Sequence, residues 1–243
     1  MLPGKIKTAL KYLPQLLLLR FGGQFRIAGV RVVAPFLDQK RAEALRAKVG
    51  ASLSLLQNYS PKHHRRVERF IPNVLILGGH SYRAVYTADL KLCDVSREFA
   101  LSESTSPERL ALTLVHEAAH GYIHSRGVLY AEDRRARIER ICVKAEIAFA
   151  DRIPQGHALV AEAKQCLEYG PDYWTDKSFL RREVEGLTKA GMPQFLIRAF
   201  ARRRSRRVRT GRGEVAQPIA PLNGGPATPA ASSGVTEGPP SVS

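Results

Sequence analysis

Cysteine is scarce in this chain, and no hydrophobic run is long. The 243 residues contain three cysteines, at positions 93, 142 and 166, and none lies in a Cys-x-x-Cys pair. This odd number argues against a disulfide framework and favours a reducing compartment, where each thiol packs as a small apolar side chain. The leucine run at residues 16–19 is too short to span a bilayer, and no small-residue cleavage site follows it. We therefore expect a cytoplasmic protein.

Acidic residues are also scarce, above all at the two ends. The net charge is +16. Residues 1–40 hold seven Lys or Arg against one acidic residue, residues 198–243 hold eight against two, and the segment between them holds 23 against 19. The eight C-terminal arginines are Arg198, Arg202, Arg203, Arg204, Arg206, Arg207, Arg209 and Arg212. Such an arm could bind nucleic acid or anionic lipid weakly, which would place the protein at a membrane or the nucleoid, or it could be solvated without a partner.

The hydropathy pattern divides the chain into three parts. Hydrophobic residues make up 44% of the chain, which is enough for a packed core. We predict a basic N-terminal helical segment at residues 1–40 and one α+β domain at residues 41–197. Residues 198–243 form the Arg-rich arm and a Gly-, Pro- and Ser-rich tail that we expect to be disordered. The N-terminal helix is expected to pack on the domain, with a helix lying on a membrane surface as the alternative.

Periodicity predicts the elements of the domain. Short segments at residues 73–79, 82–89 and 90–95 predict a small sheet of three or four strands, with helices on one side. One of these strands is expected to be an edge at which an extended peptide could bind. Helices are predicted at residues 42–57, 131–153, 158–167 and 179–187. The histidine-containing cluster at residues 62–66 is expected to be a solvated loop.

The most informative pattern is His-Glu-Ala-Ala-His at residues 116–120. Two histidines four residues apart lie on the same face of a helix, so both imidazoles can reach one zinc ion. The glutamate beside the first histidine can then take a proton from bound water. The pattern therefore predicts His116 and His120 as metal ligands and Glu117 as a general base.

Local signals place this motif inside a buried helix. Ser106 is a good N-cap, Pro107 suits the first helical position, and Gly127 is a suitable stop. The run between them is apolar almost all round. If this were only a core helix, Glu117 would be buried without a partner, which is costly. A metal site explains the three polar residues together.

The motif and the helix that follows it resemble the gluzincin metallopeptidases. In that family a glutamate on the next helix follows the two histidines, and here eighteen residues separate His120 from Glu139. The run Leu-Val-His-Glu-Ala-Ala-His-Gly-Tyr at residues 114–122 is similar to the SprT-like proteases, and Phe-Ala-Asp-Arg-Ile-Pro at residues 149–154 to the ImmA/IrrE-like peptidases. The resemblance implies a minimal zincin-like fold and a Zn²⁺ ion held by the two motif histidines and Glu139, with Glu117 as general base.

Several residues compete for the third ligand position. Glu139 is favoured on the family spacing, while Glu146, two turns further along the same helix face, is either the rival ligand or a partner that orients a histidine. Cys142 could approach the metal, but a packed thiol is the simpler interpretation. His124 is too far along the helix axis from the first histidine, and His157 is a poor candidate.

These features predict a zinc metallopeptidase with an unidentified peptide or protein substrate. A group that stabilises the developing oxyanion is expected in such a site. The candidates are Tyr122, Tyr130, Tyr169, Tyr173 and His157. The alternative is an interaction protein, associated with nucleic acid or a membrane, in which the zincin fold is retained and peptidase activity is absent or secondary.

Overall fold

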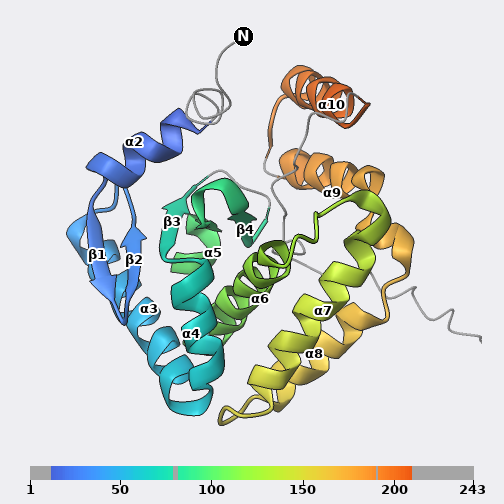
Figure 1. The fold of residues 1–243 in the computed structure, drawn as a ribbon. Coiled ribbons are helices and arrows are strands. Elements are labelled where there is room, and N and C mark those ends of the chain that lie inside the picture. The colour runs from blue at the N-terminus through green and yellow to red at the C-terminus, as the bar shows by residue number, and fades with distance from the viewer. Residues whose placement is uncertain (1–11, 79–81, 190, 210–243) are drawn as a thin grey trace, which may run out of the picture.

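The chain combines a small sheet with a layer of helices. The computed structural model describes residues 12–78, 82–189 and 191–209 (Figure 1). In these residues a mixed five-stranded sheet packs against helices, which confirms the α+β class. Within the same ranges, we find no helix with the length and apolar character needed to cross a bilayer. The tail beyond Gly211, which is predicted to be disordered, lies outside the described residues.

The sheet has the strand order β1-β2-β3-β5-β4. Its strands are β1 (Gln24–Ile27), β2 (Val30–Val33), β3 (Asn73–Leu77), β4 (Ala84–Thr87) and β5 (Leu92–Ser96). β2, β3 and β5 run parallel, whereas β1 and β4 pair antiparallel to their neighbours at the two edges. The described residues thus contain the predicted small sheet, which is mixed and has five strands instead of three or four.

The two additional strands correct the prediction of a helical N-terminal segment. β1 and β2 form a hairpin, and β2 joins the sheet by pairing with β3, with Val32 opposite Val74. The two turn residues, Ala28 and Gly29, have φ of 44° and 81°, as a two-residue hairpin turn requires. Alanine seldom adopts a positive φ, so the sequence gives little sign of this turn. Among residues 12–38, only α2 (Leu13–Phe21) is helical, and the hairpin belongs to the same sheet as the strands that follow.

The helices of the described chain follow the predicted positions, apart from the short α5 (Arg97–Leu101), which was not predicted, and two further exceptions. They are α3 (Gln39–Tyr59), α4 (Pro61–Phe70), α5 (Arg97–Leu101), α6 (Pro107–Ser125), α7 (Glu132–Ala150), α8 (His157–Leu167), α9 (Asp176–Lys189) and α10 (Gln194–Arg209), with short turns η1 (Ala88–Leu90) and η2 (Pro171–Trp174). The first exception is α10, which begins before the Arg-rich arm and runs into it, so the boundary predicted at residue 198 falls inside a helix.

The second exception is α4, where a solvated loop was predicted. Pro61 starts this helix, and its buried residues are His63, His64, Val67 and Phe70. This spacing puts the four side chains on one helix face, which packs against α6. The loop prediction was wrong because the high charge of this segment indicates exposure, although its buried residues have helical spacing.

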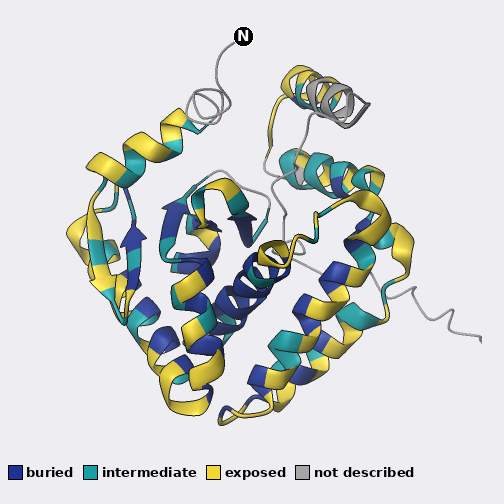
Figure 2. Ribbon diagram, in the orientation of Figure 1, coloured by how far each residue is buried: buried dark blue, intermediate teal, exposed yellow. Residues whose placement is uncertain are grey.

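Alternation along the strands gives the sheet two buried faces. Val32, Val74 and Ile76 belong to the main core, together with residues of α3, α4 and α6. Val33 and Leu75 point the other way, into a smaller cluster beneath α2. Figure 2 shows α6 as an almost continuous run of buried residues in the middle of the helical layer. The motif helix is therefore the central element of the fold.

Candidate metal centre

Helix α6 holds the His-Glu-x-x-His motif in the interior. The Ser106 side chain caps the helix by accepting a hydrogen bond from the backbone N–H of Arg109 at 3.3 Å, and Pro107 opens its first turn. Gly127 follows its end with φ of 77°. The predicted capped and buried helix is thus confirmed. His116 and His120 are both buried, and their ring centroids lie 4.9 Å apart.

Helix α7 places a carboxylate between the two imidazoles. The Nε2 atom of His116 lies 3.2 Å from Oε2 of Glu139, and the Nε2 atom of His120 lies 3.6 Å from the other oxygen of the same carboxylate. Glu139 is 1% exposed. The two histidines and this glutamate, predicted together from the sequence, therefore converge on one buried point between α6 and α7.

Cys142 joins this group from the next turn of α7. One potential ligand atom from each of His116, His120 and Cys142 lies within 4.8 Å of the other two. All three side chains are buried, so the cluster could hold a metal ion. From the sequence, a packed thiol is the simpler interpretation of Cys142. The sequence signal for its place in the cluster is its position one turn after Glu139.

Glu146 contacts the opposite nitrogen of the first histidine. Its carboxylate forms a hydrogen bond with Nδ1 of His116, whereas Glu139 faces Nε2. In this arrangement the two rival glutamates occupy different sides of one imidazole ring. A carboxylate on the outer nitrogen of a ligand histidine fixes the ring orientation and the tautomer.

The charges in the centre shift the pKa values of its members in opposite directions. Burial lowers the pKa of His120 to about 3. Burial alone would also lower the pKa of His116, but Glu146 and Glu139 outweigh it and hold that pKa well above its usual value. Burial tends to raise the pKa of Glu139, yet the adjacent histidines and Tyr130 hold it below its usual value. A carboxylate at the centre therefore remains ionised.

Glu117 is buried beside this cluster. It is fully inaccessible, and neither carboxylate oxygen has a hydrogen-bond partner of good geometry among the described residues. The backbone of Tyr86 lowers the pKa of Glu117, with a smaller effect than burial and the neighbouring charges. Burial, together with Glu139 and Glu146, raises the pKa of Glu117 to about 8, against the opposing effect of His116. A buried carboxyl group without strong partners is costly, which fits a group retained for chemistry.

Tyr130 is the candidate oxyanion group that reaches the centre. Its hydroxyl donates a hydrogen bond to Glu139, and its ring packs edge-on against His120 with centroids 5.5 Å apart. Burial and the neighbouring Glu139 raise its pKa well above the usual value, so the hydroxyl keeps its proton. The guanidinium of the buried Arg135 lies 5.1 Å from the centroid of the Tyr130 ring and pairs with Asp176 at 2.7 Å.

The other predicted oxyanion candidates lie elsewhere. Tyr122 packs edge-on against Phe70 on α4, and Tyr169 and Tyr173 stack on each other at 4.1 Å. His157 is exposed at the start of α8. The sequence does not distinguish these candidates, because the position of Tyr130 beside His120 depends on the turn that precedes α7.

Two cavities adjoin the centre. The first, of about 240 Å³ including space open to solvent, is lined by Tyr86, His120 and Tyr130 together with Ala88, Ile123, His124, Val128 and Ile138. His124, judged too distant to be a ligand, lies exposed in the last turn of α6 and forms part of this rim. This cavity gives a path from solvent to the second histidine.

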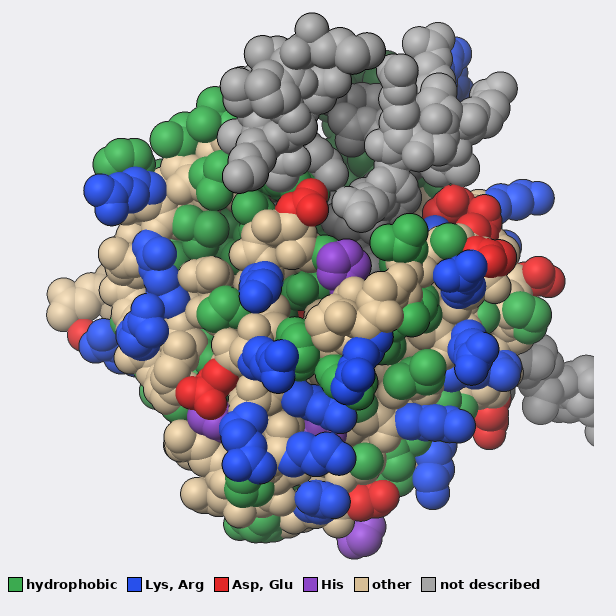
Figure 3. Space-filling model, viewed as in Figure 1, with side chains coloured by type: hydrophobic (Ala, Val, Ile, Leu, Met, Phe, Trp, Pro, Cys, Tyr) green, Lys and Arg blue, Asp and Glu red, His purple; other side chains and the backbone are tan. Residues whose placement is uncertain are grey.

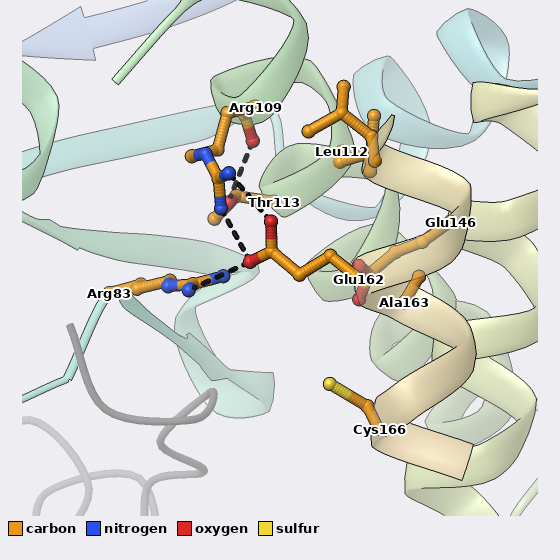
Figure 4. A pocket seen from close by; sticks show the side chains of 9 residues that line it. Arg83, Arg109, Leu112, Thr113, Glu146, Glu162, Ala163 and Cys166 are labelled. Carbon is orange, nitrogen blue, oxygen red and sulfur yellow. Dashed lines mark hydrogen bonds and ion pairs between the residues drawn. The ribbon is translucent and has the colours of Figure 1, made fainter. Parts of the chain in front are cut away.

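The second cavity, of about 390 Å³ on the same measure, lies on the Glu146 side (Figure 4). In it Glu162 of α8 accepts two hydrogen bonds from Arg109, both at 2.6 Å, and pairs with Arg83 at 3.4 Å. Glu146 lines the same cavity from α7. No sequence signal could identify this network, because its three members are far apart along the chain and belong to no motif.

Comparison with known proteins identifies no relative. No family model, no curated protein and no solved structure matches this chain. A functional proposal therefore depends on the geometry of the centre itself.

Proposed function

We propose that the chain is a zinc-dependent metallopeptidase in which His116, His120 and Glu139 hold the metal. The convergence of two imidazole Nε2 atoms on one buried carboxylate, at 3.2 and 3.6 Å, carries this proposal. Two histidines and one glutamate are a ligand set used by catalytic zinc sites that keep a position open for water or substrate. Cys142, as a soft sulfur donor in the same cluster, is the competing third ligand.

The ionisation states of His120 and Glu139 suit metal binding, whereas His116, whose pKa is raised, would have to release a proton to bind the metal. Zinc needs neutral imidazoles and an ionised carboxylate. The depressed pKa of His120 keeps its ring neutral, and the depressed pKa of Glu139 keeps its carboxylate charged. Burial holds the pKa of Cys142 well above its usual value, so its thiol is protonated in the absence of a metal. This difference favours Glu139 over Cys142 as the ligand.

Glu117 would act as the general base. A zinc ion at the centre would acidify a bound water and polarise the substrate carbonyl. Glu117 would take the proton of the attacking water and pass it to the leaving amine. Its pKa of about 8 is close to the range in which a group can both accept and return a proton near neutral pH. Tyr130 keeps its hydroxyl proton, which it donates to Glu139 in this structure and would redirect to the developing oxyanion.

The sheet edge supports a peptide as the substrate. Within the part of the chain that the structure describes, β4 is an edge strand that pairs on one side only, with β5, and α6 packs against it. An extended peptide can add to such an edge through backbone hydrogen bonds. Tyr86 of β4 also lines the cavity that leads to His120 and Tyr130. A peptide bound along β4 would therefore run past the proposed metal centre.

Metal analysis and peptide hydrolysis of the full chain test this proposal. We expect zinc in purified wild-type protein and chelator-sensitive cleavage of a fluorescence-quenched peptide library. Glu117→Gln should retain the zinc and lose roughly 100-fold or more in kcat/KM, the size expected for a general base. Glu168→Gln, which changes an exposed glutamate at the end of α8, is the matched control and should leave both properties unchanged.

Wild-type protein without zinc would contradict the metal centre. Zinc without hydrolysis, in wild-type protein against the whole library, would instead favour an interaction protein that retains the centre for structure. Hydrolysis that persists in Glu117→Gln would remove Glu117 from the proposed chemistry.

A further inference from the structure

Exposed hydrophobic side chains concentrate near the start of the described chain. Five large apolar residues between positions 13 and 36 are at least 36% exposed, and Phe21 and Phe36 reach 78% and 84%. The five are Leu13, Leu16, Leu17, Phe21 and Phe36, here called the N-terminal surface. Single exposed hydrophobic residues are ordinary on proteins, but a group of them marks a contact surface.

Among the described residues, helix α2 is held on the protein by one side. Leu18 and Leu19 pack against the small cluster formed by Val33, Leu75 and Leu92 beneath the helix. No residue of α2 is buried, and only Gln15 and Arg20 are polar among its nine residues. Figure 2 shows the helix largely exposed along its length. An apolar helix attached in this way exposes Leu13, Leu16 and Leu17 on the side that faces away from the sheet.

The two phenylalanines stand at the same end of the β1–β2 hairpin. The backbone N–H of Ala34 donates to the carbonyl of Gly23 at 3.0 Å, which brings the two chain segments together. Phe21 precedes this contact by two residues and Phe36 follows it by two. Phe36 also has φ of 63°, a conformation that favours glycine. A strained backbone that displays an aromatic ring to solvent indicates a functional constraint.

The charge of this region identifies the chemistry of a partner. Residues 1–37 contain six Lys or Arg and no Asp or Glu. Figure 3 shows hydrophobic side chains at the upper left, where Figure 1 draws α2 and the hairpin, with Lys or Arg side chains beside them. Exposed leucine and phenylalanine in a purely cationic segment match an interface of acyl chains and anionic headgroups.

We propose that the N-terminal surface docks the protein onto an anionic lipid bilayer, with Phe21, Phe36 and the α2 leucines entering the headgroup boundary. A nucleic acid would satisfy the positive charge but offers no apolar layer for the leucines. A second copy of the chain would bring the same positive charge against its own. The surface shares no residue with the metal centre, so this inference stands whether or not the protein is a peptidase.

Vesicle flotation with the full chain tests the docking. We expect binding to phosphatidylcholine vesicles that contain roughly 30% phosphatidylserine, and at least about tenfold weaker binding to pure phosphatidylcholine. Phe36→Gly should weaken binding by about tenfold without loss of folding, because glycine suits the positive φ of this position. Phe21→Ser should weaken it to a similar extent.

Phe195→Ser is the matched control, since Phe195 is 70% exposed on α10, outside the N-terminal surface. Its binding should equal that of the wild type, and an equal loss would overturn the assignment to this surface. Equal affinity for neutral and anionic vesicles would also overturn it. A dimer in sedimentation that Phe21→Ser dissociates would overturn the lipid-docking proposal. Binding of duplex DNA that Phe36→Gly abolishes would overturn it as well.

Discussion

The Nε2 atom of His116 lies 3.2 Å from a carboxylate oxygen of Glu139, a residue 23 positions further along the chain. The contact joins α6 to α7. A metal ion bound by both side chains would lie between these two atoms. Zinc would therefore replace a hydrogen bond and an ion pair that the buried groups already form. The competing ligand, Cys142, lies one turn away on the same helix.

Glu139→Ala and Cys142→Ala should separate these two ligands. If Glu139 binds the metal, its removal should lower the zinc affinity by roughly 100-fold or more, since losing a ligand exceeds the 10–100-fold cost of losing an outer partner. Cys142→Ala should change the affinity by less than about threefold, because only a packed thiol is lost. Competition with a fluorescent zinc chelator measures both values. The reverse order of effects would assign the third position to Cys142.

Glu146→Gln should weaken zinc binding without removing a ligand. Glu146 contacts Nδ1 of His116, and glutamine preserves the shape of that contact but not its charge. We expect a loss of about 10–100-fold in zinc affinity, as for other outer partners of metal-bound histidines. The same competition assay applies, with Glu168→Gln as the control. An unchanged affinity would show that Glu146 does not orient the histidine.

The sequence predicted α6 well because its signals are local. A capping serine, a first-turn proline and a terminal glycine fix the helix bounds, and the two histidines follow from helical spacing. Glu139, which the resemblance singled out by its spacing, lies 3.2 Å from Nε2 of His116. By contrast, the separate contacts of Glu139 and Glu146 with the two nitrogens of His116 depend on side-chain rotamers. No sequence period can encode those.

The errors have equally specific causes. Ala28 adopts a positive φ in the β1–β2 turn, whereas two-residue hairpin turns usually contain Asn-Gly or Asp-Gly at these positions. In α4 two adjacent histidines point inward although they stand among four Lys and Arg residues, and residue-type averages predict such a segment to be solvated. Tertiary packing decided both cases.

Gly121→Ala should destabilise the fold. A Cβ atom at Gly121 would lie 2.6 Å from Cβ of Phe70 and 3.2 Å from the Tyr86 ring, so α6 would have to move away from α4 and β4. We expect a loss of about 1–3 kcal/mol in the free energy of unfolding, despite the higher helix propensity of alanine. Gly50→Ala in α3 is the matched control, since its Cβ would meet only Ile27 at 3.8 Å. That change should stabilise the protein by about 0.5–1 kcal/mol. Urea titration measures both, and similar effects at the two positions would refute the close approach.

His63 should make the stability depend on pH. Burial lowers the pKa of its ring to about 4, helped by Arg66, Arg152 and Lys62, and its Nδ1 lies 2.8 Å from the Ser60 hydroxyl. In the unfolded chain the pKa returns to its ordinary value of 6.5, so between these values the unfolded state binds more protons. This contribution is therefore complete above pH 6.5, and it is lost as the pH falls towards 4, by at most about 3 kcal/mol.

Comparison of wild type with His63→Gln isolates this effect, because every other titrating group is common to both proteins. Between pH 6.5 and 4 the unfolding free energy of the wild type should fall more steeply than that of the variant, as measured by urea titration at each pH. His157→Gln, which changes an exposed histidine on α8, should follow the wild-type curve. Parallel curves for wild type and His63→Gln would mean that the buried ring accepts a proton in the folded state as readily as in the unfolded chain.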